Sequence, residues 1–430
     1  MRTIGLLLFS TCIFLACSKN SVETSEPEEK AQQEQTTTNE SERVFVESDF
    51  YKAPSTYAVI KNLVEDYGVD NSFDTDDSDL LQIAVNDIHS LGGGRLIIPE
   101  GNYSFAEVKL KSNVHIVISH KAVLRPSLRG DTRNFKIFSI GRHNDKVENI
   151  SIVSDSETEK FMVDLRFGDN RNVAVFSFGY TENFLISGVH ILDKLTVFSS
   201  FTFGISEFNS DWKFSKNGVI KNAVTEGAHY GYGLVQAQAL QNVLFKKIDG
   251  EGGVTLRLET GEKQMNNLQI GGVFDIYGDQ ISCTSGNAAA MISPHAMHCG
   301  KVYLQNIYSK SSGFAVRIGD GFVSKKYTTP GLINGTFESV ELRNVHADFG
   351  NKAQLKSKHY KYMPCELRGQ ISTIPIDQEG TSFYGPSVAG VLNTANYPVV
   401  FNQKAMIANG FVAGYEYVDD SEAIENCEQK

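Results

Sequence analysis

The sequence predicts an all-β chain wound as a parallel β-helix, a solenoid in which each coil stacks on the next. A short phrase recurs in which asparagine or another turn residue precedes alternating apolar residues. Its copies are Asn149–Ile152, Asn183–Ile186, Asn217–Ile220, Asn242–Phe245 and Asn267–Ile270, with a last one at Phe337–Leu342. The first five begin 25 or 34 residues apart, as coils of two or three strands require. A Greek-key sandwich also has many short strands, but it would not space the phrase so evenly.

A short helix is expected to cap the N-terminal end of the solenoid. Apolar residues recur at helical spacing over 79–88, Asp77 or Ser78 is suited to the N-cap, and a triple glycine at 92–94 ends the helix. Short strands divided by turns follow over 95–118. Helix, triple glycine, a strand ending in Pro-x-Gly-x-Tyr and a Leu-Lys-Ser-Asn-Val strand together resemble the first coil of the pectin-lyase-like superfamily. The resemblance implies a right-handed parallel β-helix.

The N-terminus resembles a bacterial lipoprotein signal. The uncharged apolar run over 4–16 is too short to span a bilayer as a helix, and it stops at Cys17. Phe-Leu-Ala-Cys at 14–17 resembles a lipobox, in which the cysteine carries the lipid; an ordinary signal peptide with an incidental cysteine is the alternative. We expect a lipoprotein signal peptide over 1–17 and a disordered acidic tether over 18–48. The chain would be secreted or anchored in the outer membrane through lipidated Cys17, outside the cytoplasm.

The β-helix body is expected over 49–345, and residues 346–430 read as late coils, loops and a C-terminal tail. A net charge of -11, from 40 basic against 51 acidic residues, argues against nucleic acid as a partner. Cys283, Cys299, Cys365 and Cys427 permit three disulfide pairings, which the sequence leaves open. Their spacing does not suit a zinc site, and no metal site is expected from them. We expect a monomer.

Charged side chains alternate with apolar ones on the strand over 252–261. Alternation places Val254, Leu256 and Leu258 inward. The outward set is Thr255, Arg257 and Glu259. An ion pair on a solvated sheet would explain such a row equally well, and it would contribute little to stability.

Neighbouring coils favour a functional strip. Gln236 and Gln238 point to one side of their strand, His295 ends a strand one coil later, and Arg317 repeats the outward arginine. Stacked strands lie roughly 4.8 Å apart, so these side chains would form one polar strip that suits a sulfated or carboxylated sugar chain. Aromatic side chains that would stack on sugar rings are Trp212, Tyr230 and Tyr232, although core packing suits Trp212 equally.

Three phrases resemble the iota-carrageenase family of glycoside hydrolases: Tyr-Gly-Leu-Val-Gln at 232–236, Gly-Gly-Val-Thr-Leu-Arg-Leu-Glu-Thr at 252–260 and Ala-Ala-Met-Ile-Ser-Pro-His at 289–295. The resemblance covers about residues 65–320. It implies hydrolysis of the β-1,4 linkages of a sulfated red-algal galactan with inversion, without a required cofactor; a structural calcium ion is left open. The implied catalytic residues are Glu259 as general acid, with His295 and Gln236 beside it. The implied substrate-binding residues are Arg257, Arg317 and Gln238, the arginines by bidentate bonds to sulfate.

The sequence departs from the family pattern at Gly261, where that pattern has an aspartate that activates water. Inverting hydrolysis needs a base opposite the acid. The candidate replacements are His295, Asp275, Asp279 and Glu262. The alternative is a weak or inactive copy, a lipid-anchored β-helix that binds carrageenan. A polysaccharide lyase or epimerase is a further alternative, although Ser293-Pro294-His295 lacks the aspartate of the corresponding epimerase turn and no carboxylate cluster suited to calcium is apparent.

Overall fold

The computed structural model describes residues 42–127, 132–168 and 170–427, which belong to one compact unit. The predicted signal peptide over 1–17, with Cys17, lies outside the described residues, and so does most of the predicted tether. In the part of the chain that is described, no helix has both the length and the apolar character needed to cross a membrane.

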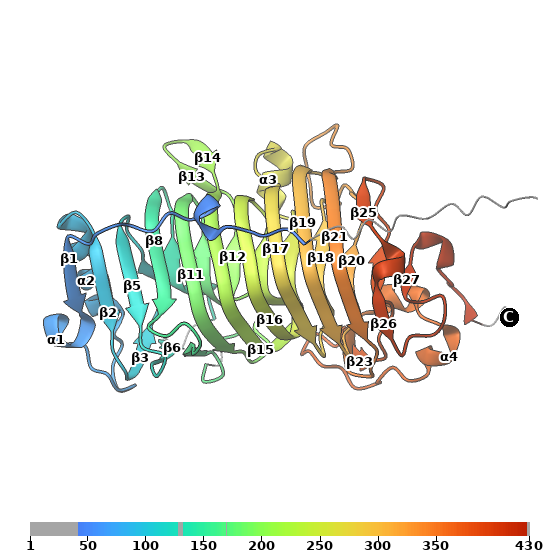
Figure 1. The fold of residues 1–430 in the computed structure, drawn as a ribbon, viewed down its shortest axis with the longest axis horizontal. Coiled ribbons are helices and arrows are strands. Elements are labelled where there is room, and N and C mark those ends of the chain that lie inside the picture. The colour runs from blue at the N-terminus through green and yellow to red at the C-terminus, as the bar shows by residue number, and fades with distance from the viewer. Residues whose placement is uncertain (1–41, 128–131, 169, 428–430) are drawn as a thin grey trace, which may run out of the picture. The chain divides into compact units, whose positions relative to one another are not determined.

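The unit is the right-handed parallel β-helix that the sequence predicted (Figure 1). Its strands pair in parallel and form three sheets, because each coil bends twice. The first sheet begins and ends with short strands: β1 (Val59–Asn62), β2 (Gly94–Ile98), β5 (Val114–Ile118), β8 (Val147–Ser154) and β25 (Val399–Phe401). Between them, long strands bend from the first sheet into the second: β11 (Thr181–Leu192), β15 (Ser215–Ala237), β16 (Leu240–Glu259), β17 (Val273–Thr284), β19 (His298–Lys310) and β21 (Thr336–Asp348).

The second sheet is completed by β3 (Asn102–Phe105), β6 (Val123–Pro126), β9 (Phe161–Asp164) and β26 (Ile407–Asn409). The third sheet contains β4 (Val108–Lys109), β7 (Phe135–Ile140), β10 (Val173–Phe178), β12 (Phe201–Phe203), β18 (Ala288–Ser293), β20 (Phe314–Ile318), β24 (Val391–Asn393) and β27 (Tyr417–Val418), together with the last residues of β15 and β16.

Smaller elements project from the coils. β13 (Ser206–Phe208) and β14 (Asp211–Lys213) form an antiparallel hairpin, and β22 (Ala353–Leu355) pairs with the distant β23 (Phe383–Gly385), also antiparallel. The remaining helices are α1 (Leu63–Tyr67), α3 (Lys263–Leu268), α4 (Cys365–Arg368), and the 3-10 turns η1 (Glu47–Asp49), η2 (Ser357–Tyr362), η3 (Gln403–Ala405) and η4 (Asp420–Glu422).

Helix α2 (Ser78–Ser90) lies where the sequence predicts the capping helix, beside β2 and β4. Asp77 occupies the N-cap position, but its carboxylate accepts a hydrogen bond from the Ser104 backbone N–H at 2.9 Å rather than from its own helix. The buried face of the helix consists of Ser78, Leu81, Ala84, Val85 and Ile88. The helix ends at Ser90, Leu91 is its C-cap, and Gly92 and Gly93 follow with positive φ.

The recurring asparagines form a ladder along the first sheet. Each adopts positive φ, which asparagine tolerates better than most residues. Neighbouring amides bond across the coils: Asn149 to Asn113 at 3.0 Å, Asn183 to Asn149 at 2.9 Å and Asn242 to Asn217 at 2.8 Å. The fifth copy predicted at Asn267–Ile270 is wrong, because Asn267 lies in α3. The ladder position after Asn242 is Asp275, since Val243 pairs with Ile276.

Phenylalanine rings stack from coil to coil inside the third sheet. Ring centroids lie 5.3 Å apart between Phe138 and Phe176, 4.7 Å between Phe176 and Phe201, and 4.4 Å between Phe178 and Phe203. All are fully or almost fully buried. This packing holds the third sheet rigid, and it is this sheet that presents the predicted polar strip.

Residues 42–58 form a strap across the first sheet, visible as the blue trace in Figure 1. Arg43 bonds to Gln305 at 3.1 Å and to Glu341 at 3.0 Å, while the ring of Phe45 packs on Tyr277 and Tyr303. The predicted disordered tether therefore extends too far at its C-terminal end. Residues 42–48 contact the β-helix because Arg43 bonds to the first sheet and Phe45 packs on it. The polar composition of the segment did not predict these contacts.

The C-terminal region, residues 346–427, adds coils and a long excursion. Strands β24 to β27 continue the three sheets, while residues 353–385 leave the solenoid and fold back along it. Of the four cysteines whose pairing the sequence left open, Cys365 and Cys427 form a disulfide. Cys283 and Cys299 are free and buried.

Candidate functional site

The third sheet brings most of the predicted site residues into one strip. Gln236 on β15 is in register with Arg257 on β16, which is in register with Met291 on β18 and then with Arg317 on β20. A second row lies two residues further along. In it Gln238 precedes Glu259 by one coil, because Ala237 pairs with Leu258. Thr255, predicted to point outward, is instead fully buried, and its hydroxyl donates to the Ser282 carbonyl at 2.6 Å.

Arg257, Glu259 and His295 form the centre of the strip. One carboxylate oxygen of Glu259 is in a salt bridge with Arg257, and the other lies 3.2 Å from Nε2 of His295. The side chains of Arg257 and Glu259 are 17% and 14% exposed, so the pair is largely shielded from water. Arg257 also donates to the backbone carbonyl of Gly231.

Glu259 is a carboxylate in this arrangement. Burial by itself would raise its pKa, but the Arg257 guanidinium and the His295 hydrogen bond outweigh burial and hold the pKa well below its usual range. A general acid needs a proton near neutral pH, so the acid role that the resemblance implies requires this salt bridge to open.

His295 is held by its surroundings on both faces. It follows β18 with φ of 48°, and its ring lies 4.3 Å from the ring of Phe322. Nδ1 is 2.8 Å from the Tyr327 hydroxyl. A Cβ atom at Gly261 would lie 3.0 Å from Nε2 of His295. The imidazole therefore occupies the space in front of position 261, and the small residue there leaves room for it.

Arg317 lies in the row of Arg257, as predicted from the alternation, but it is only 8% exposed. The segment 353–385 covers it: Nη1 of Arg317 lies 2.5 Å from Nε2 of His359 and 3.5 Å from the Tyr230 hydroxyl. Burial, together with Arg317 and nearby lysines, lowers the pKa of His359 well below its usual range, so this ring is neutral and accepts from Arg317.

Lys358 adds a second cation beside the central group. Its side chain is exposed to solvent, but the protein atoms around it and the charge of Arg317 lower its pKa to about 8. The charges of Glu259 and Arg257 also act on it. Sequence reasoning missed Lys358, His359 and Tyr327, because they come from loops far along the chain without a repeated phrase to mark them.

Two of the candidate bases lie elsewhere. Asp275 and Asp279 are on β17 in the first sheet, where Asp279 bonds to Gln305 at 3.2 Å and Asn306 at 2.8 Å. They do not share the third sheet with Glu259.

Glu262 is a carboxyl group close to the strip. Oε2 of Glu262 would lie 3.3 Å from a Cβ atom at Gly204. Gly204 follows Phe203, which pairs with Ala237. Gly204 is thus in the row of Glu259 but two coils earlier, a backbone separation of roughly 10 Å. Burial raises the pKa of Glu262, although Arg142 acts in the opposite direction.

Of the three aromatic residues predicted to stack on sugar rings, one borders the strip and two do not. Tyr232 borders the strip, with the Arg257 guanidinium 5.7 Å from its ring centre. Tyr230 is buried beneath the covering segment, and Trp212, on β14, is half-buried against the core.

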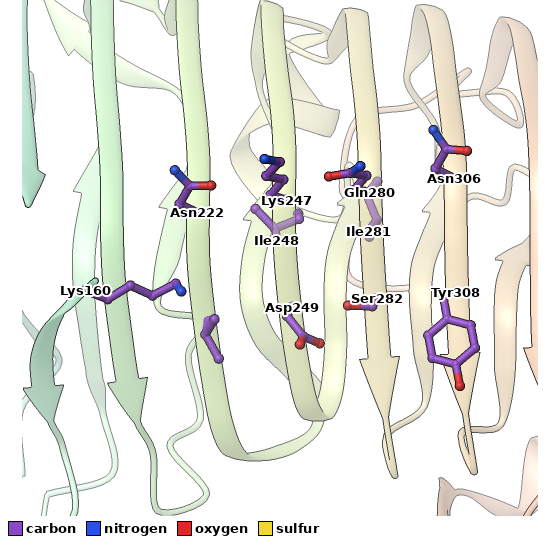
Figure 2. A pocket seen from close by; sticks show the side chains of 11 residues that line it. Lys160, Asn222, Lys247, Ile248, Asp249, Gln280, Ile281, Ser282, Asn306 and Tyr308 are labelled. Carbon is purple, nitrogen blue, oxygen red and sulfur yellow. The ribbon is translucent and has the colours of Figure 1, made fainter. Parts of the chain in front are cut away.

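A separate hollow lies on the second sheet, where Asp249, Ser282 and Tyr308 follow one another on successive strands (Figure 2). It does not include any of the predicted site residues.

Comparison with known proteins identifies close relatives, although no family model matches the chain. It is 38% identical to an iota-carrageenase of Alteromonas macleodii over 412 residues, covering 82% of this chain and 83% of that one. It is 31% identical to an iota-carrageenase of Zobellia galactanivorans, with 86% of each chain covered. A solved structure of an iota-carrageenase complexed to iota-carrageenan fragments superposes with a TM-score of 0.81 at 30% identity, covering 90% of this chain and 96% of that one.

Proposed function

Because the chain belongs to the iota-carrageenase family, we propose that it is an extracytoplasmic glycoside hydrolase that cleaves the β-1,4 linkages of iota-carrageenan with inversion. The observation that carries the proposal is the Arg257–Glu259–His295 group on the third sheet of a chain with this ancestry. The reaction as proposed requires no cofactor.

The strip is suited to a sulfated sugar chain. Arg257 offers a planar guanidinium for a sulfate, and Lys358 adds a mobile ammonium group beside it. These cations stand out in a chain with a net charge of -11. Gln236 and Gln238 are half-buried on the neighbouring coil and would bond to sugar hydroxyls. Arg317 would orient Tyr230 and His359 rather than meet sulfate directly, unless the segment over it moves.

Sulfate binding would also prepare the acid. In the free chain Arg257 neutralises Glu259, so a substrate sulfate that draws Arg257 away would leave a largely buried carboxyl without its counter-charge. Burial would then raise the pKa of Glu259 and favour the protonated form that donates to the leaving oxygen. His295 would keep the carboxyl oriented through its 3.2 Å contact.

We propose Glu262 as the base that replaces the aspartate missing at Gly261. His295 is too close to Glu259, at 3.2 Å, to act from the opposite face of a sugar. The Glu262 carboxyl lies beside Gly204, whose backbone is roughly 10 Å from that of Glu259, near the about 6.5–9.5 Å that an inverting pair needs for its water. Burial raises the pKa of Glu262, which is the direction that suits a base.

The second candidate function is carrageenan binding without turnover. The ionised, salt-bridged Glu259 and the glycine at 261 favour it, since a binder needs the cations but neither a proton donor nor a base. We further propose a monomer, secreted or anchored in the outer membrane through Cys17, on the strength of the lipobox-like sequence.

The test is product formation from a panel of polysaccharides. We would incubate the purified chain with iota-, kappa- and lambda-carrageenan, alginate and pectate, and measure new reducing ends and ultraviolet absorbance of unsaturated products. Hydrolysis predicts reducing ends from iota-carrageenan without absorbance, lost in Glu259→Gln. Absorbance would mean a lyase. No product from any substrate, with migration still retarded in an iota-carrageenan gel, would establish the binder.

Glu262→Gln tests the base separately. We expect a loss of about a hundred- to ten-thousand-fold in kcat, with added azide restoring turnover because it attacks without a base. A variant with unchanged kcat would remove Glu262 from the mechanism without affecting the assignment of Glu259.

A further inference from the structure

A second group of ionisable side chains lies where the excursion 353–385 returns to the solenoid. His229 is on β15, and Asp377 and Glu379 belong to the excursion. Nε2 of His229 lies 3.2 Å from Oε2 of Glu379 and 3.6 Å from Oδ2 of Asp377. One ligand atom from each residue fits within 4.8 Å of the others.

The hydrogen bonding of His229 fixes the proton on the far side of its ring. Nδ1 lies 2.6 Å from the carbonyl oxygen of Tyr230. A carbonyl can only accept, so Nδ1 carries a proton, and a neutral ring presents a bare Nε2 lone pair to two carboxylates. The side chain is 5% exposed, so water cannot readily separate these groups. A positive charge is needed between them.

The distances suit a metal ion better than a direct hydrogen bond. Charge-assisted N–H···O bonds are about 2.7–2.9 Å long. Ligand atoms around a tetrahedral ion at about 2.0–2.1 Å stand about 3.3 Å apart. The two contacts of His229, at 3.2 and 3.6 Å, lie near the second value.

The surrounding bonds orient these ligands as second-shell partners do. The Asp377 carboxylate accepts from the Ser382 hydroxyl at 2.6 Å and from the Thr381 backbone N–H at 2.9 Å. Arg171 lies 3.3 Å from the other oxygen of Glu379, Oε1, and leaves Oε2 toward His229. Glu379 is 47% exposed and provides a path from solvent to the two buried ligands.

We propose that His229, Asp377 and Glu379 bind a divalent transition-metal ion of the Zn²⁺ class, with water in the remaining position. Imidazole nitrogen suits such an ion, whereas Ca²⁺ takes oxygen ligands. The ion ties the excursion to β15 one residue before Tyr230, whose hydroxyl reaches Arg317 under the covering segment. This inference is independent of the proposed hydrolase, because it concerns binding and stability alone.

The experiment uses the purified full chain without a histidine tag, stripped with EDTA and dialysed. Titration with Zn²⁺ by calorimetry should show one tight site per chain, and Co²⁺ should give the visible absorption of four-coordinate cobalt. The melting temperature should rise by about 3 °C at a hundredfold excess of Zn²⁺ over Kd. Glu379→Gln and His229→Gln should each weaken binding at least about tenfold.

The matched control is His190→Gln. His190 contacts one carboxylate, that of Glu226, at a direct hydrogen-bond distance of 2.8 Å. The His190→Gln variant should therefore leave Zn²⁺ binding unchanged. Because Glu379 is partly exposed, Glu379→Gln should fold even if His229→Gln does not. Absent Zn²⁺ binding, equal binding by Glu379→Gln, or a preference for Ca²⁺ would each overturn the proposal.

Discussion

The imidazole of His295 stands directly against Gly261, so that a Cβ atom at position 261 would lie 3.0 Å from Nε2. The same nitrogen is 3.2 Å from Glu259. At position 261 this chain has a glycine, and the ring of His295 fills the space in front of it while contacting Glu259. A larger side chain at position 261 would therefore displace the ring of His295.

Gly261→Ala should disturb catalysis through His295. The added methyl group must push the ring away, which breaks its contact with Glu259 and should lower kcat by roughly tenfold to a hundredfold. Gly319→Ala is the control, since a Cβ atom there would meet nothing closer than 3.9 Å. Release of reducing ends from iota-carrageenan measures both. Unchanged kcat in Gly261→Ala would mean that the orientation of His295 is irrelevant to turnover.

Arg257→Gln should change how stability depends on pH. With Arg257 present, the pKa of Glu259 is below its unfolded value, so the pair contributes stability above that unfolded value and loses it as pH falls through the folded pKa. Without Arg257, only His295 and Arg317 oppose the effect of burial, so the pKa of Glu259 rises and this stabilising contribution shrinks. The loss of melting temperature in the variant should therefore be largest at neutral pH and shrink toward pH about 4.

Lys301→Gln provides the comparison for that experiment. Lys301 pairs with Glu338, but both side chains are 62% exposed, so its melting curve should match the parent within error at every pH. A loss in Arg257→Gln that does not vary with pH would contradict the assignment of Glu259 as the paired carboxylate.

Lys358 should make substrate affinity fall in mild alkali. Burial lowers its pKa to about 8, so its charge is lost as pH rises through that value. KM for iota-carrageenan should then rise several-fold above pH 8, but not in Lys358→Arg, which stays charged. Lys358→Met should raise KM below pH about 8, where the parent lysine is charged, and should approach the parent above it, whereas Lys352→Met, at an exposed position, should not raise KM. A KM independent of pH in the parent would exclude contact between Lys358 and substrate.

The cysteines should differ sharply in reactivity. Burial raises the pKa of the Cys283 thiol to about 11 and that of Cys299 to about 12, so neither should react with iodoacetamide in the native chain, and both should after unfolding. Peptide mapping should find Cys365 linked to Cys427. Reducing this bond, which closes a 62-residue separation, should cost up to about 4 kcal/mol in the C-terminal region. Native labelling of Cys283 or Cys299 would contradict their burial.

Local patterns predicted the solenoid because each coil repeats the same requirement. An asparagine at a positive-φ corner, followed by alternating apolar residues, is a property of a few neighbouring residues, and four copies fell where the ladder has them. The fifth failed because Asn267 belongs to a helix inserted between coils, after which an aspartate, Asp275, takes the ladder position. An inserted helix changes the number of residues between successive ladder positions, so a matching phrase at the expected interval can lie outside the ladder.

The alternation on β16 likewise placed Arg257 and Glu259 beside each other, and the strand register brought His295 to them. These contacts follow from the two-residue alternation of side-chain direction along a strand and from the stacking of successive coils. The sequence predicts both. The charge state of Glu259, the burial of Arg317 and the presence of Lys358 do not follow from any such period.

By itself the sequence determined the β-helix, the position of the capping helix and the neighbouring positions of Arg257 and Glu259 on one strand face, because regular backbone hydrogen bonding turns local alternation into a fixed side-chain direction. Only the tertiary structure decided what covers that strip, how the cysteines pair and where residues 42–48 lie. Those features arise from contacts between segments tens to hundreds of residues apart, and chain geometry rather than local pattern brings such segments together.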